Sequence, residues 1–224
     1  MSDVYDFSAV RNVQIPQLGS LLTRLLGYKS GGTFVEVGGY DGLYVSNTYP
    51  LAKLGWNGYY IEPIYHEACR KNHRLHKNVT VSPYAIGEVA GEVQMHVGGP
   101  LSTCSSTARD IFENLNWAKG CFKNKGIVTV QQMTLNDYLL EQQVSPNFDL
   151  LVVDVEGYEW SVFKNFDLQR WHPKVIICEL HDKNDSYERL RDSHGQVREK
   201  ILELYDIQYE DFTNTVFSLR SNAT

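Results

Sequence analysis

Short apolar runs and amphipathic stretches alternate along this sequence. The most apolar run, Phe148 to Val153, is interrupted only by Asp149 and is typical of a strand buried on both faces of a parallel sheet. Similar runs predict further strands over 33–37, 56–61, 79–82, 91–97, 128–132 and 174–178. Helical spacing predicts helices over 17–27, 43–54, 66–76, 157–166 and 190–204, with another beginning at Thr134. The last two runs, 207–212 and 216–219, predict an antiparallel pair.

The order of these elements predicts an α/β fold. Strands that alternate with helices form a doubly wound, mostly parallel sheet, here with an antiparallel C-terminal strand. We expect residues 1–32 to form an N-terminal arm, loosely docked as far as Pro16, followed by a helix, and residues 33–224 to form one domain. Residues 98–126 contain glycines, serines and threonines without a clean period. A loop of that length inside a domain is usually functional, so we expect it to bind substrate.

Composition narrows the classes of protein. The chain has 224 residues and a net charge of −6, and its lysines and arginines are scattered, so a nucleic-acid partner is not expected. No apolar run reaches the length of a membrane span, and no signal peptide pattern begins the sequence. The four cysteines show no CxxC spacing. We therefore expect free thiols, no membrane partner and a cytoplasmic location.

A glycine-dense turn, Gly38-Gly39-Tyr40-Asp41-Gly42, follows the first predicted strand. Its glycines allow positive φ angles and let a ligand approach the main chain closely. Glu62 follows Gly42 by twenty residues, at the end of the second predicted strand, where a carboxylate can accept both hydroxyls of a ribose. A dinucleotide and S-adenosylmethionine share this geometry. Because the second and third glycines of the dinucleotide pattern are missing, S-adenosylmethionine is favoured over a nicotinamide cofactor.

Together with this turn, four further segments resemble the FkbM-type methyltransferases. They are Tyr60-Ile61-Glu62-Pro63, Ala85-Ile86-Gly87, Thr134-Leu135-Asn136-Asp137 and Leu151–Glu159, which contains Asp154-Val155-Glu156-Gly157 and is the most specific. The resemblance runs from about Thr33 to His181. It implies a class I methyltransferase fold, Rossmann-like, and transfer of a methyl group from S-adenosylmethionine to a hydroxyl of a sugar or glycan. The rival expectations are a nicotinamide-dependent oxidoreductase and a non-catalytic domain of this fold that binds a glycan or another partner.

The resemblance also implies which residues bind the cofactor. The methionine part would be surrounded by Glu36, Gly38, Gly39, Asp41, Gly42 and Ser46. Glu62 would hold the ribose. The adenine would lie between two pairs, Pro63 and Ile64 on one side and Ala85 and Ile86 on the other. Asp154 would face the methyl group and the acceptor. The turn departs from the family at Tyr40, which could line or narrow the substrate side.

The chemistry requires activation of the acceptor. A sugar hydroxyl is a weak nucleophile, so it needs a base or a metal ion. His181 is the only histidine predicted at a strand end near the site, and imidazole suits a base. Asp154, Glu179 and His181 could instead hold one divalent ion, Mg²⁺ or Mn²⁺. Both routes stay open, as does a plain structural role for Glu179 and His181.

Several other features are expected to be less specific. His66, His73 and His76 lie on a charged predicted helix and should be solvated, whereas His194 lies on an apolar stripe and should be a core histidine. Trp117, in the expected loop, could stack on a sugar ring. A homodimer, or a place as one domain of a larger glycan-modifying protein, stays open.

Overall fold

A seven-stranded sheet forms the centre of the computed structural model, which describes residues 4–8, 10 and 13–221. Its strand order is β3-β2-β1-β7-β8-β10-β9. The strands are β1 (Thr33–Val37), β2 (Asn57–Ile61), β3 (Val79–Ser82), β7 (Leu150–Val153), β8 (Val175–Glu179), β9 (Tyr205–Glu210) and β10 (Asn214–Leu219). Pairing is parallel from β3 to β8, and β10 runs antiparallel to both of its neighbours. The predicted mostly parallel sheet with an antiparallel C-terminal strand is confirmed.

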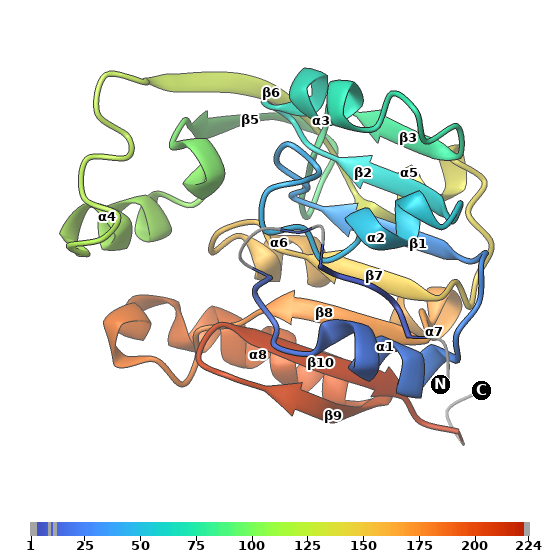
Figure 1. The fold of residues 1–224 in the computed structure, drawn as a ribbon. Helices are drawn as coiled ribbons and strands as arrows, with labels where there is room; N and C mark the ends of the chain where they lie inside the picture. The colour runs from blue at the N-terminus through green and yellow to red at the C-terminus, as the bar shows by residue number, and fades with distance from the viewer. Residues whose placement is uncertain (1–3, 9, 11–12, 222–224) are drawn as a thin grey trace.

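Helices cover both faces of this sheet, as Figure 1 shows. One face packs against α5 (Leu135–Glu141), α6 (Glu159–Phe163), α7 (Leu168–Trp171) and α8 (Arg191–Leu202). The other packs against α1 (Leu18–Leu26), α2 (Tyr49–Lys53) and α3 (His66–Asn72). Side chains alternate along β1, so Val35 and Val37 join the first core and Phe34 joins the second. This burial on two faces explains why the parallel strands are almost continuously apolar.

The segment 98–126 contains more regular structure than the sequence predicts. It connects two strands of a second sheet, in the order β4-β6-β5, whose members are β4 (Ala85–Ile86), β5 (Gly91–His96) and β6 (Ile127–Met133). Within it lie the 3₁₀ helix η1 (Gly99–Leu101) and the helix α4 (Ser106–Asn114). The expectation of an unstructured loop is therefore wrong. Ile111 and Phe112 of α4 pack with Tyr187 of η2 (Asp185–Leu190) in a small separate core.

The helix predicted over 43–54 is wrong in its first half. Residues 40–47 form turns and bends, and only α2 is helical. The Oδ1 atom of Asp41 accepts hydrogen bonds from the amides of Leu43, at 2.9 Å, and Tyr44, at 2.7 Å, which closes a turn. Val45 has a φ of +55°, which is unusual for a β-branched residue and prevents a helix there.

The N-terminal arm packs more closely than expected. Tyr5 and Ile15 are 2% and 0% exposed and belong to the core on the α1 side of the sheet. The hydroxyl of Tyr5 also donates a hydrogen bond to the carbonyl of Gly27, at 2.8 Å. Loose docking is therefore wrong for this part of the arm. Residues 1–3, 9, 11 and 12 lie outside the described residues.

Two expectations from composition can be compared with the structure. All four cysteines are free, as predicted, and two of them are buried. Among the residues that the structure describes, no helix is both long enough and apolar enough to cross a membrane.

Candidate active site

The strand register brings the predicted site residues to one edge of the large sheet. Val37 pairs with Ile61 on one side and with Val153 on the other, and Val153 pairs with Cys178. The residue after each of these positions therefore lies at the carboxyl edge: Gly38, Glu62, Asp154 and Glu179. Ligands of doubly wound sheets bind at this edge.

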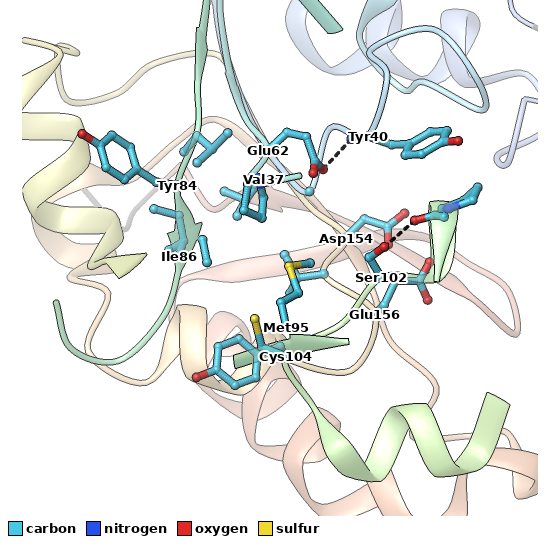
Figure 2. Close-up of a pocket in the computed structure, with 18 residues that line it drawn as sticks. Val37, Tyr40, Glu62, Tyr84, Ile86, Met95, Ser102, Cys104, Asp154 and Glu156 are labelled. Carbon is cyan, nitrogen blue, oxygen red and sulfur yellow. Dashed lines mark hydrogen bonds between the residues drawn. The ribbon is translucent and has the colours of Figure 1, made fainter. Parts of the chain in front are cut away.

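A first cavity lies over the ends of β1, β2 and β7. Figure 2 shows Tyr84 and Ile86 at one end, Val37 and Glu62 in the middle, and Asp154 and Glu156 at the other end. Pro63 and Ala85, predicted to face adenine, also line it, together with Met95 from the second sheet. The apolar end fits a flat aromatic base, and the polar middle and far end fit hydroxyl and charged groups.

The carboxylate of Glu62 accepts three backbone hydrogen bonds that its position in the sequence does not predict. Its Oε1 atom accepts hydrogen bonds from the amides of Ile64, at 2.7 Å, and Tyr65, at 2.9 Å, and its Oε2 atom accepts one from Tyr40, at 3.0 Å. Burial raises the pKa of Glu62, and these hydrogen bonds oppose that shift. The carboxylate thus ties the glycine turn to the segment after β2 and faces the cavity with its remaining lone pairs.

Tyr40 holds an unusual backbone conformation in this turn. Its φ is +45°, and its ring packs edge-on against Tyr65, with 4.8 Å between the ring centroids. It lines the first cavity and also a second one beside it. A non-glycine residue with positive φ at a cavity wall is typical of functional sites.

The second cavity lies over the glycine turn. It is lined by Glu36, Gly38, Gly39 and Ser46, which were predicted around the methionine part of a cofactor, and by Gln14 and Asn47, which were not. It shares Gly38, Tyr40, Pro100, Asp154 and Glu156 with the first cavity, so the two form one elongated space.

Polar groups in this second cavity are poised for an amino acid-like ligand. Thr48 donates a hydrogen bond to the Oε2 atom of Glu36, and burial raises the pKa of Glu36 to about 8. The Oδ1 atom of Asn47 is buried and has no hydrogen-bond partner among the described residues. A ligand that carries an ammonium group would satisfy both side chains, because each offers an oxygen acceptor.

Gly38 is required where the two strand ends meet. Its φ is +87°, and a Cβ atom there would lie 1.7 Å from the carbonyl oxygen of Asp154. Neither the conformation nor the space admits a side chain. The glycine therefore lets β1 and β7 approach each other directly below the cavities.

A third cavity lies beside η1 and the turns that follow α4. Its aromatic lining comes from Tyr44, Trp117 and Tyr187, and its polar lining includes Glu156, Glu179 and His181. Trp117 is 67% exposed, so the expected loop does present an aromatic face to solvent. Glu156 and Pro100 line all three cavities, which meet at these residues.

Three carboxylates converge at that meeting point. Oxygen atoms of Asp154, Glu156 and Glu179 lie within 4.8 Å of one another. Burial, followed by repulsion from Glu179, raises the pKa of both Asp154 and Glu156 well above the usual range, and burial raises the pKa of Glu179 to about 8. Three close carboxylates resist ionising together unless a cation or protons join them.

His181 lies next to this cluster but outside it. Its Nε2 atom is 3.4 Å from the Oε1 atom of Glu179, its Nδ1 atom is 3.2 Å from the carbonyl oxygen of Phe212, and its ring stacks on Tyr187. Burial lowers the pKa of His181. The group of side chains that could hold a metal ion therefore contains Glu156 in place of the predicted His181.

Three predicted cofactor residues do not line the described cavities. Asp41 closes the turn with its carboxylate, Gly42 faces Cys69 and His73, and the amide of Ile64 donates to Glu62. These three residues stabilise the glycine turn and the segment after β2.

The expectation that the side chain of His73 is solvated is wrong. It is 3% exposed, and its Nε2 atom lies 2.9 Å from the carbonyl oxygen of Gly42. Burial lowers the pKa of His73 to about 4. Its side chain thus supports the glycine turn, and only the exposed neighbours on α3 fit the charged pattern that the sequence shows.

The expectation of a core position for His194 is confirmed, and its partner was missed. His194 is 0% exposed; its Nδ1 atom accepts the amide of His181 at 2.8 Å, and its Nε2 atom lies 2.9 Å from Glu159. The other oxygen of Glu159 accepts the amides of Val155 and Gly157, each at 3.1 Å. These hydrogen bonds hold the backbone on both sides of Glu156, whose φ is +56°. For that reason α6 begins at Glu159 instead of the predicted residue 157.

Gln14 lines the second cavity although no motif in the sequence points to it. Its amide nitrogen lies 3.4 Å from the Oδ2 atom of Asp154, and its amide oxygen accepts from Asn47 at 3.1 Å. It comes from the N-terminal arm, far from any motif. The only available signal is the apolar arm itself, which predicts docking but not the position of one glutamine.

The strand order, the antiparallel β10 and a cavity over β1, β2 and β7 define the class I methyltransferase fold. The chain belongs to the FkbM methyltransferase family, because the family model described as the methyltransferase FkbM domain matches residues 36–209. The resemblance seen in the motifs is thereby confirmed.

Comparison with solved structures agrees on the fold. The FkbM methyltransferase of Methylobacillus flagellatus KT is similar at 14% identity and a TM-score of 0.51, over 89% of this chain and 48% of that chain. The present chain thus spans about half the length of that relative. The SAH-bound methyltransferase PaMTH1 of Podospora anserina is similar at 12% identity and a TM-score of 0.48, over 85% of this chain and 72% of that chain. No curated protein matches.

Proposed function

We propose that this chain is an S-adenosylmethionine-dependent O-methyltransferase that acts on a hydroxyl group of a sugar or glycan. The observation that carries the proposal is the meeting of an elongated two-part cavity with a separate aromatic cavity at Glu156. A methyl donor in the first space and an acceptor in the second would have their reacting atoms side by side there. The family match supports methyl transfer and gives no support to the nicotinamide-dependent alternative.

The two-part cavity fits the parts of S-adenosylmethionine in order. Ile86 and Ala85 would contact the adenine, and the free lone pairs of Glu62 would accept the ribose hydroxyls. Glu36 and the unpartnered oxygen of Asn47 would receive the ammonium group. The bound cofactor supplies an electrophilic methyl group on a positively charged sulfur. Asp154, which lines both parts, would lie near that charge.

The aromatic cavity supports a sugar as the acceptor. Trp117 presents an exposed indole face, and the C–H face of a sugar ring stacks well on such a surface. Glu156 and Glu179 in the same cavity offer oxygens that accept hydrogen bonds from hydroxyl groups. An apolar acceptor would leave these carboxylates desolvated and unpaired, at a cost in binding.

The chain also holds a group that can take the proton of the hydroxyl. A backbone carbonyl can only accept, so the Nδ1 atom of His181 carries a hydrogen toward Phe212. The Nε2 atom of His181 is then the acceptor, on the side of Glu179 and within the acceptor cavity. Transfer breaks the S–CH₃ bond, forms the O–CH₃ bond and leaves a neutral thioether, while the proton of the hydroxyl leaves to a base.

The test begins with the cofactor. Isothermal titration should detect binding of S-adenosylmethionine and of its demethylated product, S-adenosylhomocysteine. Glu62→Gln should weaken both by roughly tenfold or more, because it removes an acceptor of backbone amides and of the ribose. Glu67→Gln, on the exposed side of α3, is the matched control and should bind as the wild type does. Failure of both ligands to bind at millimolar concentration would overturn the proposal.

The second stage tests turnover. A panel of glycosides is incubated with the protein and isotopically labelled S-adenosylmethionine, and O-methylated products are sought by mass spectrometry. Transfer to a sugar hydroxyl is the expected result. Binding of glycans without transfer to any acceptor would instead favour the non-catalytic binding domain.

A further inference from the structure

The carboxylates of Asp154, Glu156 and Glu179 form a cluster where the cavities meet, and two of the three belong to the motif Asp154-Val155-Glu156-Gly157. Asp154 and Glu179 follow paired positions of the adjacent strands β7 and β8, so their side chains leave the same edge of the sheet. Glu156 joins them from the loop after β7, and oxygens of the three side chains lie within 4.8 Å of one another. Among the described residues, no lysine or arginine forms a salt bridge with any of the three.

One of these side chains has an oxygen that lacks a partner. Glu179 is 6% exposed, and its Oε2 atom has no hydrogen-bond partner within the part of the chain that the structure describes. Its other oxygen faces the Nε2 atom of His181 at 3.4 Å. A buried carboxylate oxygen beside other carboxylates is costly unless a proton shared with Asp154 or a bound cation satisfies it.

The cluster is also held firmly from behind. Glu159 accepts the amides on both sides of Glu156, and His194 connects Glu159 to the amide of His181, two residues after Glu179. These hydrogen bonds fix the backbone from which Glu156 and Glu179 extend, which reduces the entropy lost when their side chains gather around a ligand.

We propose that Asp154, Glu156 and Glu179 together bind one hard divalent cation, of the Mg²⁺ or Mn²⁺ class, where the cofactor and acceptor cavities meet. Oxygen ligands lie about 2.0–2.1 Å from Mg²⁺, so two ligands on opposite sides are about 4 Å apart, and the three carboxylates, whose oxygens lie within 4.8 Å of one another, need to close by less than about 1 Å around the ion. Three carboxylates leave coordination positions for water and for an acceptor hydroxyl. That last role rests on the proposed function, whereas binding of the ion does not.

The experiment measures the ion directly, on the full chain after treatment with a chelator and dialysis. Addition of MnCl₂ should show one bound Mn²⁺ per chain, by loss of the free-ion EPR signal and by calorimetry, and MgCl₂ should compete. Glu156→Gln and Glu179→Gln should each weaken Mn²⁺ binding by at least roughly tenfold, because each removes one anionic ligand. Glu188→Gln, an exposed position of η2, is the matched control and should bind Mn²⁺ as the wild type does.

Folding of each variant is checked by circular dichroism, and the wild type gives a second readout that needs no variant. Saturating Mn²⁺ should raise its melting temperature, because an ion that binds only the folded chain stabilises it. Absence of Mn²⁺ binding at millimolar concentration, or wild-type affinity in both cluster variants, would overturn the inference. Titration with S-adenosylhomocysteine separates the two proposals: if it binds while Mn²⁺ does not, the ion site alone fails.

Discussion

Gly38 offers the sharpest test of how the cavities are built. Replacement by alanine places a Cβ atom 1.7 Å from the carbonyl oxygen of Asp154, in a backbone conformation with φ of +87°. The conformation costs about 1–2 kcal/mol for a residue with a side chain. The overlap must be relieved by separating the ends of β1 and β7, and overpacking of this kind costs about 1–3 kcal/mol more. We expect Gly38→Ala to lose about 2–5 kcal/mol of unfolding free energy.

Gly120 provides a matched control. Its φ is +84°, almost the same as that of Gly38, but a Cβ atom there would meet no atom within 4 Å. Gly120→Ala should therefore lose only the conformational cost, about 1–2 kcal/mol. The difference between the two variants isolates the contact between the strand ends.

Two assays read out this pair of variants. Urea unfolding, followed by tryptophan fluorescence, gives the free energy of unfolding. Calorimetric titration with S-adenosylhomocysteine gives its affinity, which should fall at least roughly tenfold in Gly38→Ala, equivalent to about 1.4 kcal/mol, because separation of the ends of β1 and β7 displaces residues that line both cavities. If Gly38→Ala matched Gly120→Ala in both stability and affinity, the close approach of β1 and β7 would not matter and the reasoning would be refuted.

Three further changes test other parts of the molecule. His73 becomes protonated below pH 6.5 in the unfolded chain but only near pH 4 in the folded chain, where its pKa is about 4. The free energy of unfolding should therefore fall by up to about 3 kcal/mol as the pH drops from 6.5 to 4. His73→Asn should make the free energy of unfolding, measured with urea, depend less steeply on pH in this range. Glu159→Gln should lower the free energy of unfolding by about 1–3 kcal/mol, because it weakens the charge-assisted hydrogen bonds that Glu159 accepts from His194 and from the amides of Val155 and Gly157; an unchanged urea midpoint would contradict this. Trp117→Ala should raise the KM for the acceptor by up to roughly tenfold while the affinity for S-adenosylhomocysteine stays the same. If only the affinity for S-adenosylhomocysteine changed, Trp117 would not lie in the acceptor cavity.

The sequence predicts the central sheet well because burial on two faces leaves a strong local signal. The runs at Leu150–Val153 and Val175–Glu179 are fully buried, so almost every position is apolar and each run is recognisable alone. Thr134 likewise forms the predicted N-cap, with its side chain accepting the amide of Asp137. These elements depend on contacts that their own residues dictate.

The parts that sequence reasoning missed depend on distant partners. Val45 is an exception, because the turn before it is closed locally by Asp41, but its left-handed conformation is one that a β-branched residue rarely adopts. Helix α4 is only nine residues long, and its apolar side meets Tyr187, which lies far along the chain. Gln14 reaches Asp154 across 140 residues. The motifs predicted that the site residues lie at the carboxyl edge of the sheet. They did not predict that Glu156, rather than His181, joins Asp154 and Glu179, because this depends on how the loop after β7 turns back toward β8.

The pairing of β5 with β6 has a consequence for how this protein could be altered. The two strands pair up to His96 and Ile127, so the thirty residues between these positions begin and end next to each other in the structure. Everything that α4 and its flanking turns contribute to the acceptor cavity is carried by this excursion, whereas the glycine turn and Glu62 belong to the large sheet. An exchange of residues 97–126 should therefore change the wall of the third cavity around Trp117 and, through Gly99, Pro100, Ser102 and Cys104, one wall of the first cavity, while Glu62 and the glycine turn stay in place.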